Sequence, residues 1–190
     1  MKQPLDKINR REAIQKASKI MGGALSTSLV MGVLAGCKAD AVLDWRPEAL
    51  TPKEVLIVAA LAEQILPETS TPGARQAGVE RFIDSMVAGY LPEAERNAFM
   101  DGLASLAERK FTGKTPEEQH VMVTELAEEA RQQEQDADTK PFFLLAKEMT
   151  VLGFFTSEVG ATQVLNYDPI PGDFQGCMPL DEAGGKTWAT

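Results

Sequence analysis

The chain has 190 residues and carries 28 acidic against 19 basic residues, a formal net charge of −9 at pH 7. This length is enough for one domain with a real hydrophobic core. The acidic excess disfavours nucleic-acid binding, which needs basic patches, and it also disfavours direct adhesion to anionic lipid surfaces.

The N-terminal segment has the organisation of an export signal. Its first nineteen residues are polar and basic, whereas the run from Ile20 to Gly36 contains no charge and ends in small residues. A basic segment followed by an apolar run and small residues is typical of signals that direct export. The run is short and diluted by glycine and serine, so it fits a removable signal better than a permanent membrane span.

Two arginines, Arg10 and Arg11, stand just before this apolar run. Paired arginines in this place are typical of the twin-arginine export route, and the weakly apolar run also fits that class. The pattern is imperfect, because Ala13 stands where a phenylalanine is common. An ordinary secretion signal with two neighbouring arginines is the open alternative.

The apolar run ends in Leu34-Ala35-Gly36-Cys37, which resembles a bacterial lipobox. In a lipobox the cysteine becomes the first residue of the mature chain and is acylated. Two or three acyl chains anchor a protein stably where one does not. We therefore expect residues 1–36 to form a twin-arginine lipoprotein signal and Cys37 to hold the chain on the periplasmic face of a membrane. A cysteine placed there by chance is the alternative, and the choice between inner and outer membrane stays open.

Residues 37–50 are expected to form a tether, and helix signals begin after them. Thr51-Pro52-Lys53-Glu54 combines a capping threonine, a proline at the first helical position and a glutamate three residues after the cap, and Thr115-Pro116-Glu117-Glu118 repeats this arrangement. Apolar spacing then predicts helices over 51–66, from 79 to near 89, from 92 to near 110, from 115 to about 135 and from 141 within the apolar segment that ends at 161, with a further short helical piece over 157–165.

The segment that begins at Pro141, PFFLLAKEMTVLGFFTSEVGA, is apolar on most faces. Such a helix is expected at the centre of a helical domain. Gly153 is expected to allow a close approach or a bend. Because no strand-like alternation appears, the sequence predicts an all-α fold: one small domain of about five to six helices over residues 51–166.

Residues 167–190 have a different character, because prolines and glycines exclude a long helix. A disordered tail would be poor in large apolar side chains. This segment nevertheless carries six of them, namely Tyr167, Ile170, Phe174, Met178, Leu180 and Trp188. We therefore expect an irregular, extended tail that buries these side chains either on its own domain or on a partner.

Candidate catalytic groups are few. His120 is the only histidine, and Cys37 and Cys177 are the only cysteines. This supply predicts neither a metal site nor a histidine-dependent catalytic triad, although chemistry based on carboxylates alone stays open. If Cys37 is acylated, Cys177 is left unpaired, which suggests an intermolecular disulfide, a reactive thiol or a buried reduced cysteine.

Two stretches of the chain carry a family resemblance. The segment from Leu50 to Val87 contains Thr71-Pro72-Gly73-Ala74, and the segment from Phe142 to Leu180 contains Gly153-Phe154-Phe155-Thr156-Ser157-Glu158 and Pro171-Gly172 before Gly176-Cys177. Both resemble the small-subunit family called gluconate 2-dehydrogenase subunit 3.

The resemblance implies a non-catalytic small subunit of a membrane-associated dehydrogenase. The large partner would be a flavoprotein of the glucose–methanol–choline (GMC) oxidoreductase type that holds FAD and oxidises sugars, sugar acids or glycosides, and a cytochrome c would commonly accept the electrons. The export signal would carry the folded pair outward. Tyr167, Phe174 and Trp188 would take part in docking the partner, and Cys177 would take part in docking or in an intermolecular disulfide.

The lipobox departs from the pattern of many family members, and it leaves the electron acceptor open. A stand-alone envelope lipoprotein with a binding or scaffolding role is the alternative to a dehydrogenase subunit.

Overall fold

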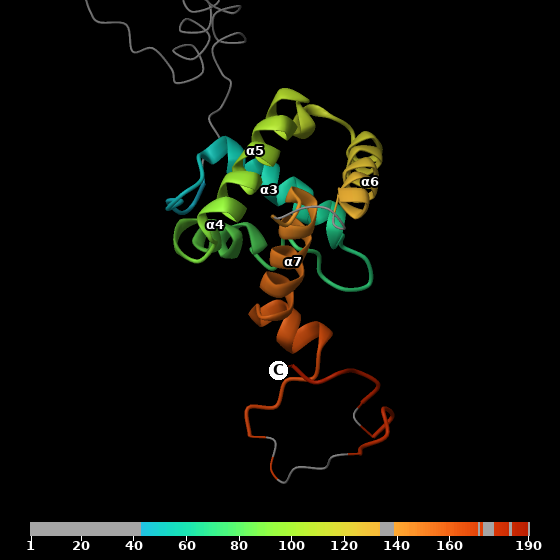
Figure 1. Cartoon of the computed structure of the whole chain (residues 1–190). Helices are drawn as coiled ribbons and strands as arrows, with labels where there is room; N and C mark the ends of the chain where they lie inside the picture. The colour runs from blue at the N-terminus through green and yellow to red at the C-terminus, as the bar shows by residue number, and fades with distance from the viewer. Residues whose placement is uncertain (1–42, 134–138, 171, 173–176, 183, 190) are drawn as a thin grey trace, which may run out of the picture. The chain divides into compact units, whose positions relative to one another are not determined.

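A computed structural model describes residues 43–133, 139–170, 172, 177–182 and 184–189, and Leu43–Thr190 forms one compact unit (Figure 1). The residues expected to direct export and to carry the lipid, Arg10, Arg11 and Cys37, lie outside the described residues, as does Phe174.

The described part of the chain contains helices and no strand beyond a single isolated bridge, which confirms the all-α prediction. The elements in chain order are α3 (Pro52–Ile65), α4 (Val79–Gly89), α5 (Glu93–Glu108), the 3-10 helix η1 (Phe111–Gly113), α6 (Pro116–Gln133), α7 (Phe142–Phe155) and the short π-helix η2 (Gly160–Val164).

Both predicted capping boxes are present. The backbone amide of Thr51 donates to Glu54 Oε2 at 2.7 Å, and Thr51 Oγ1 accepts the amide of Glu54 at 3.4 Å. The amide of Thr115 donates to Glu118 Oε2 at 2.9 Å, and its hydroxyl accepts the amide of Glu118 at 3.3 Å. These bonds satisfy backbone amides that have no partner inside the helix, and so they set where α3 and α6 begin.

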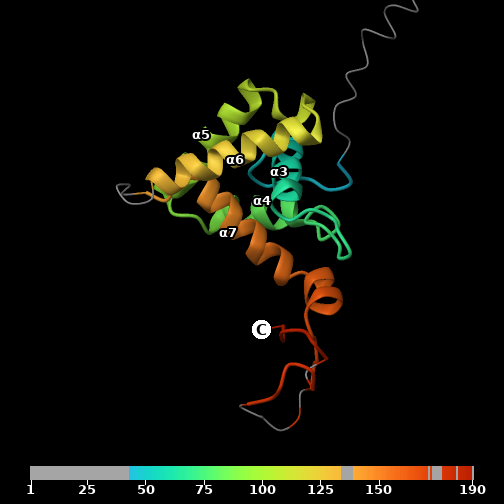
Figure 2. The same cartoon turned by 90° about the vertical axis from the view of Figure 1, so that its right-hand side faces the viewer.

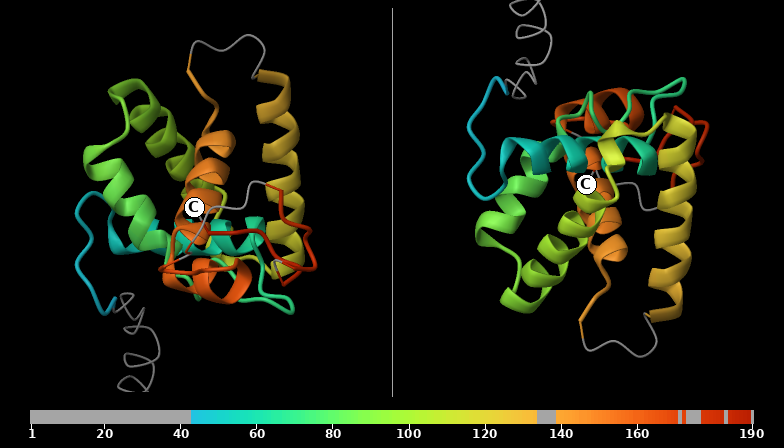
Figure 3. Two further views of the ribbon diagram at one scale, coloured as in Figure 1. Left: turned by 90° about the horizontal axis from the view of Figure 1, so that it is seen from below. Right: turned by 90° about the horizontal axis from the view of Figure 1, so that it is seen from above.

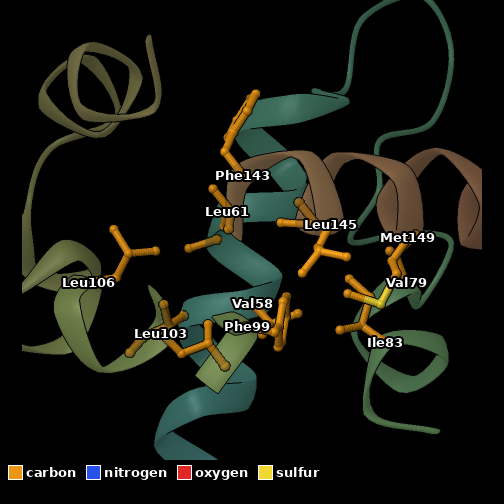
Figure 4. Packing of buried hydrophobic residues seen from close by; sticks show 14 of the residues in the cluster. Val58, Leu61, Val79, Ile83, Phe99, Leu103, Leu106, Phe143, Leu145 and Met149 are labelled. Atoms are coloured by element: carbon orange, nitrogen blue, oxygen red, sulfur yellow. The ribbon is translucent and has the colours of Figure 1, made fainter. Parts of the chain in front are cut away.

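Helices α3 and α7 form the centre of the bundle, because each contacts α4, α5 and α6 and they also contact one another (Figures 2 and 3). The side chains between the helices form one hydrophobic cluster, which Figure 4 shows from close by. Its fully buried members include Val58, Leu61, Ile83, Phe99 and Leu103. The apolar spacing of the predicted helices is therefore accounted for by a single core.

Gly153 of α7 lies where that helix meets α4. A Cβ at this position would stand 2.6 Å from Cδ1 of Phe82, closer than side-chain atoms pack, so the ring lies in the space that the missing side chain leaves. The predicted close approach is confirmed. The outer side of α7 is less covered: Val151 and Leu152 are exposed although the helix is central.

Residues 43–50, which the sequence assigns to a tether, are held against the domain. Leu43 and Trp45 pack on the edge of the core. Arg81 of α4 forms an ion pair with Asp44 at 2.8 Å, and its guanidinium lies 5.6 Å from the centre of the Trp45 ring. The segment before α3 is therefore part of the folded unit.

Within the described residues, none of the helices combines the length and the apolar character that crossing a membrane requires.

Candidate functional site: the C-terminal loop

Beyond α7 and η2, the described residues 187–189 return to Asn166, where the C-terminal segment starts, and Figure 1 shows the described part of this segment in orange to red beyond the end of α7. We call the described residues 167–170, 172, 177–182 and 184–189 the C-terminal loop. It contains the sequence-predicted docking residues Tyr167 and Trp188 and the cysteine Cys177.

The base of the C-terminal loop is closed by backbone pairing at one residue. The amide of Asn166 donates to the carbonyl of Thr187 at 2.7 Å, and the carbonyl of Asn166 accepts the amide of Ala189 at 2.7 Å, which makes a parallel bridge between Asn166 and Trp188. The side-chain amide of Asn166 donates to the carbonyl of Lys186 at 2.9 Å. One residue therefore holds the returning chain with three hydrogen bonds.

A second group of bonds shapes the returning part of the loop. The amide of Gly185 donates to the carbonyl of Leu180 at 2.7 Å, and the amide of Gly184 donates to the carbonyl of Asp181 at 3.1 Å. Gly184 and Gly185 have φ angles of 74° and 76°, a left-handed conformation that glycine adopts without a steric penalty. Leu180, Asp181, Gly184 and Gly185 therefore belong to a hydrogen-bonded turn that depends on its two glycines.

The large apolar side chains of the C-terminal loop are not buried on the helices. Their exposed fractions are 82% for Ile170, 61% for Leu180, 59% for Tyr167, 46% for Trp188 and 37% for Met178. Isolated exposed apolar residues are ordinary on protein surfaces, but a set gathered on one segment marks an interaction site. Of the two surfaces expected to bury this segment, the chain's own domain does not do so.

The remaining sequence-predicted positions do not assemble into a catalytic centre among the described residues. Cys177 is exposed and unpaired with any described cysteine. His120 is exposed on α6. No cluster of three metal-binding side chains occurs in the ranges that the structure describes.

The half-buried carboxylate of Glu80 has an unusual environment. Glu80, in the first turn of α4, is half-buried, and its Oε2 atom has no hydrogen-bond partner. Burial raises the pKa of the Glu80 carboxyl above its ordinary value, and a hydrogen bond from its own backbone amide and the nearby Arg81 and Arg75 only partly oppose that shift.

Sequence reasoning missed the residue that organises the loop. Nothing in the sequence marks Asn166, because its partners lie about twenty positions later and a single-residue bridge leaves no periodic pattern. From the sequence, Ile170 and Leu180 are only apolar members of the tail, although they are the two most exposed of its described apolar side chains. Both residues stand next to prolines or acidic residues in the sequence, where neither a helical nor a strand pattern predicts a buried position.

The described residues thus define a small all-α domain that presents an exposed, mostly apolar loop. The family model described as gluconate 2-dehydrogenase subunit 3 matches residues 52–172. This range includes α3 to η2 and the first residues of the C-terminal loop, so the chain belongs to the gluconate 2-dehydrogenase subunit 3 family and is an accessory subunit of a dehydrogenase complex. Neither a search of curated proteins nor a search of solved structures found a match for the chain.

Proposed function

We propose that this chain exports, anchors and docks a flavoprotein dehydrogenase subunit of the GMC type, which binds FAD and oxidises an alcohol group of a sugar, a sugar acid or a glycoside. Family membership supports the complex, because the family's description names one subunit of a dehydrogenase. In this proposal the oxidation takes place at the FAD of the partner.

The observation that carries the docking role is the exposure of the apolar side chains on the C-terminal loop. Ile170 and Leu180 leave most of their surface in water, where each costs hydrophobic free energy. A partner surface that covered them would recover that free energy. The loop is therefore the part of the described chain best suited to hold a second protein.

The export role rests on the sequence. Arg10 and Arg11 precede a weakly apolar run, and the twin-arginine route carries proteins that have already folded. A flavoprotein that had bound FAD inside the cell could then travel with this chain. Acylation of Cys37 would hold the pair at the periplasmic face of a membrane, where a cytochrome c is one candidate electron acceptor.

A stand-alone envelope lipoprotein is the alternative function. It would be expected to bury its C-terminal segment on its own helices. The described residues of that segment are exposed instead, which favours the subunit of a complex.

Replacement of both Arg10 and Arg11 by lysine tests the export role. The twin-arginine route requires the arginine pair, so we expect the double variant to leave this chain and the flavoprotein in the cytoplasm, as judged by cell fractionation. The single variant of Lys16 to arginine is a matched control that should export both proteins. If the flavoprotein still reaches the periplasm when this chain does not, the escort role is wrong.

A further inference from the structure

We infer that the C-terminal loop is already shaped for docking in the free chain, and that it fits an apolar hollow edged by basic side chains on the flavoprotein. The inference rests on the proposed function for the identity of the partner. It adds the residue that shapes the loop, Asn166, and the chemistry of the surface that the loop contacts.

The first step is the closure of the loop base. Asn166 holds the returning chain through its backbone amide, its backbone carbonyl and its side-chain amide. All three hydrogen bonds form within this chain, so none of them requires a second protein. Lys186 adds a fourth bond, because its Nζ donates to the carbonyl of Gln163 at 2.9 Å. A flexible segment would lose conformational entropy when it bound, whereas a loop closed beforehand has already lost part of it.

The second step is the local shape of the loop beyond its base. The amide of Ile170 donates to Asp168 Oδ1 at 3.0 Å, an Asx-type turn that orders the chain next to Ile170. The carbonyl of Leu180 itself accepts the amide of Gly185 in the second turn. The two most exposed apolar side chains among the described residues of the loop thus both belong to residues that take part in a hydrogen-bonded turn, which suits them to act as anchors in a partner's pocket.

The third step is charge. Asp168, Asp181 and Glu182 are exposed on the loop and flank its apolar residues. The only cation of residues 167–190, Lys186, is engaged at the loop base. We call these three carboxylates the acidic rim. A partner surface that covers the apolar residues therefore meets the acidic rim, and basic side chains at the edge of that partner surface would complement it.

The same charges argue against two other occupants. A second copy of this chain would place acidic loop against acidic loop, and an anionic lipid surface would repel the loop. Another exposed apolar surface is a groove at α7 lined by Leu144, Val151 and Leu152, whose lining also contains the charged residues Lys140, Lys147 and Glu148. Nothing in the structure shows what covers that groove.

Hydrogen exchange on the detergent-purified chain alone tests whether the loop is preformed. The amides of Asn166 and Ala189 should be protected in the free chain, and Asn166→Ala should lower the protection of Ala189 at least about fivefold, as expected for the loss of one hydrogen bond. The thermal midpoint of the helices should stay unchanged, because Asn166 lies outside the core cluster. Fast exchange of both amides in the unaltered free chain would overturn the preformed loop.

Binding of the coexpressed flavoprotein subunit tests the surface. Ile170→Asp and Leu180→Asp should each weaken the complex at least about tenfold, the effect of losing a buried interface anchor. Val121→Asp, which alters an apolar residue of α6 about as exposed as Leu180, is the matched control and should leave the affinity unchanged. If Leu152→Asp weakens the complex and the two loop variants do not, the docking surface is the groove on α7 and the inference is wrong.

The acidic rim has its own test. Asp181→Asn combined with Glu182→Gln should slow association and reduce its dependence on salt, because fewer charges then steer the encounter. Asp101→Asn combined with Glu108→Gln removes two exposed carboxylates from α5 and should leave the rate unchanged. Equal effects of the two double variants would show that net charge, and not the rim, controls association.

The outcomes separate this inference from the proposed function. A complex that forms normally but ignores every loop variant overturns the docking surface and leaves the proposed function standing. If no flavoprotein binds under any condition, the proposed function fails together with the surface. A dimer of this chain that Ile170→Asp dissociates, or binding of the loop to phosphatidylglycerol vesicles, overturns the assignment of the occupant.

Discussion

The buried carboxylate of Asp84 in α4 accepts the backbone amide of Leu50 at 2.8 Å, although the two residues are 34 positions apart. It also accepts the amides of Glu48 at 2.7 Å and Ala49 at 3.1 Å. Three amides of the segment before α3 thus converge on one side chain that is fully buried. This arrangement joins the N-terminal segment of the domain to α4.

Asp84→Ala should be among the most destabilising single substitutions in the chain. It leaves three backbone amides near or in the interior without their acceptor, and hydrogen bonds to a charged group are strong, so we expect a loss of about 3 kcal/mol or more in the free energy of unfolding. Urea denaturation measures this loss, and the exposed Asp101→Ala on α5 is the matched control. An unchanged urea midpoint for Asp84→Ala would show that these bonds do not hold the segment.

The contact between α4 and α7 gives a second prediction. Gly153→Ala would place a methyl group 2.6 Å from the Phe82 ring, so we expect a loss of about 1–3 kcal/mol from overpacking. Gly89→Ala, at a position where a Cβ meets nothing within 4 Å, should have little effect on stability. Adding Phe82→Leu to Gly153→Ala should recover part of the loss in a double-mutant cycle, and full additivity of the two losses would contradict the proposed contact.

Glu80 gives a prediction about pH. Because burial raises the pKa of its carboxyl in the folded state, the folded chain binds the proton more tightly than the unfolded chain does. The stability that this group contributes is then fully present below the unfolded pKa and is lost as the pH rises through the folded pKa.

Glu80→Gln and Glu80→Met, which cannot ionise, should therefore gain stability relative to the unaltered chain as the pH is raised from 4 toward neutrality, the range that begins near the ordinary glutamate pKa. Urea denaturation at several pH values measures the difference. A difference that stays constant over this range, for both variants, would contradict the shifted pKa.

The membrane anchor can be tested without reference to the partner. Cys37→Ser removes the acyl acceptor, so the chain should move from the membrane fraction to the soluble periplasmic fraction. Cys177→Ser keeps Cys37 and should remain in the membrane fraction. If both variants stay with the membrane, acylation of Cys37 is not what anchors the chain.

Much of the helical domain could be predicted because its signals are local. Thr51 and Glu54, or Thr115 and Glu118, are close in sequence and mark a helix start by themselves. The apolar character of α7 likewise indicated a central helix. Asp84 gave no such signal, since its partners lie 34 to 36 residues away and an aspartate in a helix is more often exposed.

The candidate site was predicted in composition but not in geometry. The sequence showed that Tyr167 and Trp188 belong to an apolar segment that needs a surface. It did not show that Asn166 closes this segment into a loop, because glycine and proline allow many paths between the two ends. Whether the segment packs on its own helices depends on long-range contacts, and no spacing rule reports those.

The central claim is that this chain holds a flavin-bearing dehydrogenase subunit through its C-terminal loop. The most direct measurement is purification of the affinity-tagged chain from membranes of cells that express both subunits, followed by a flavin absorbance spectrum and a subunit ratio. The account predicts a yellow complex with one FAD-bearing subunit per chain, which Ile170→Asp and Leu180→Asp make colourless. A colourless, monomeric chain in every preparation would contradict it.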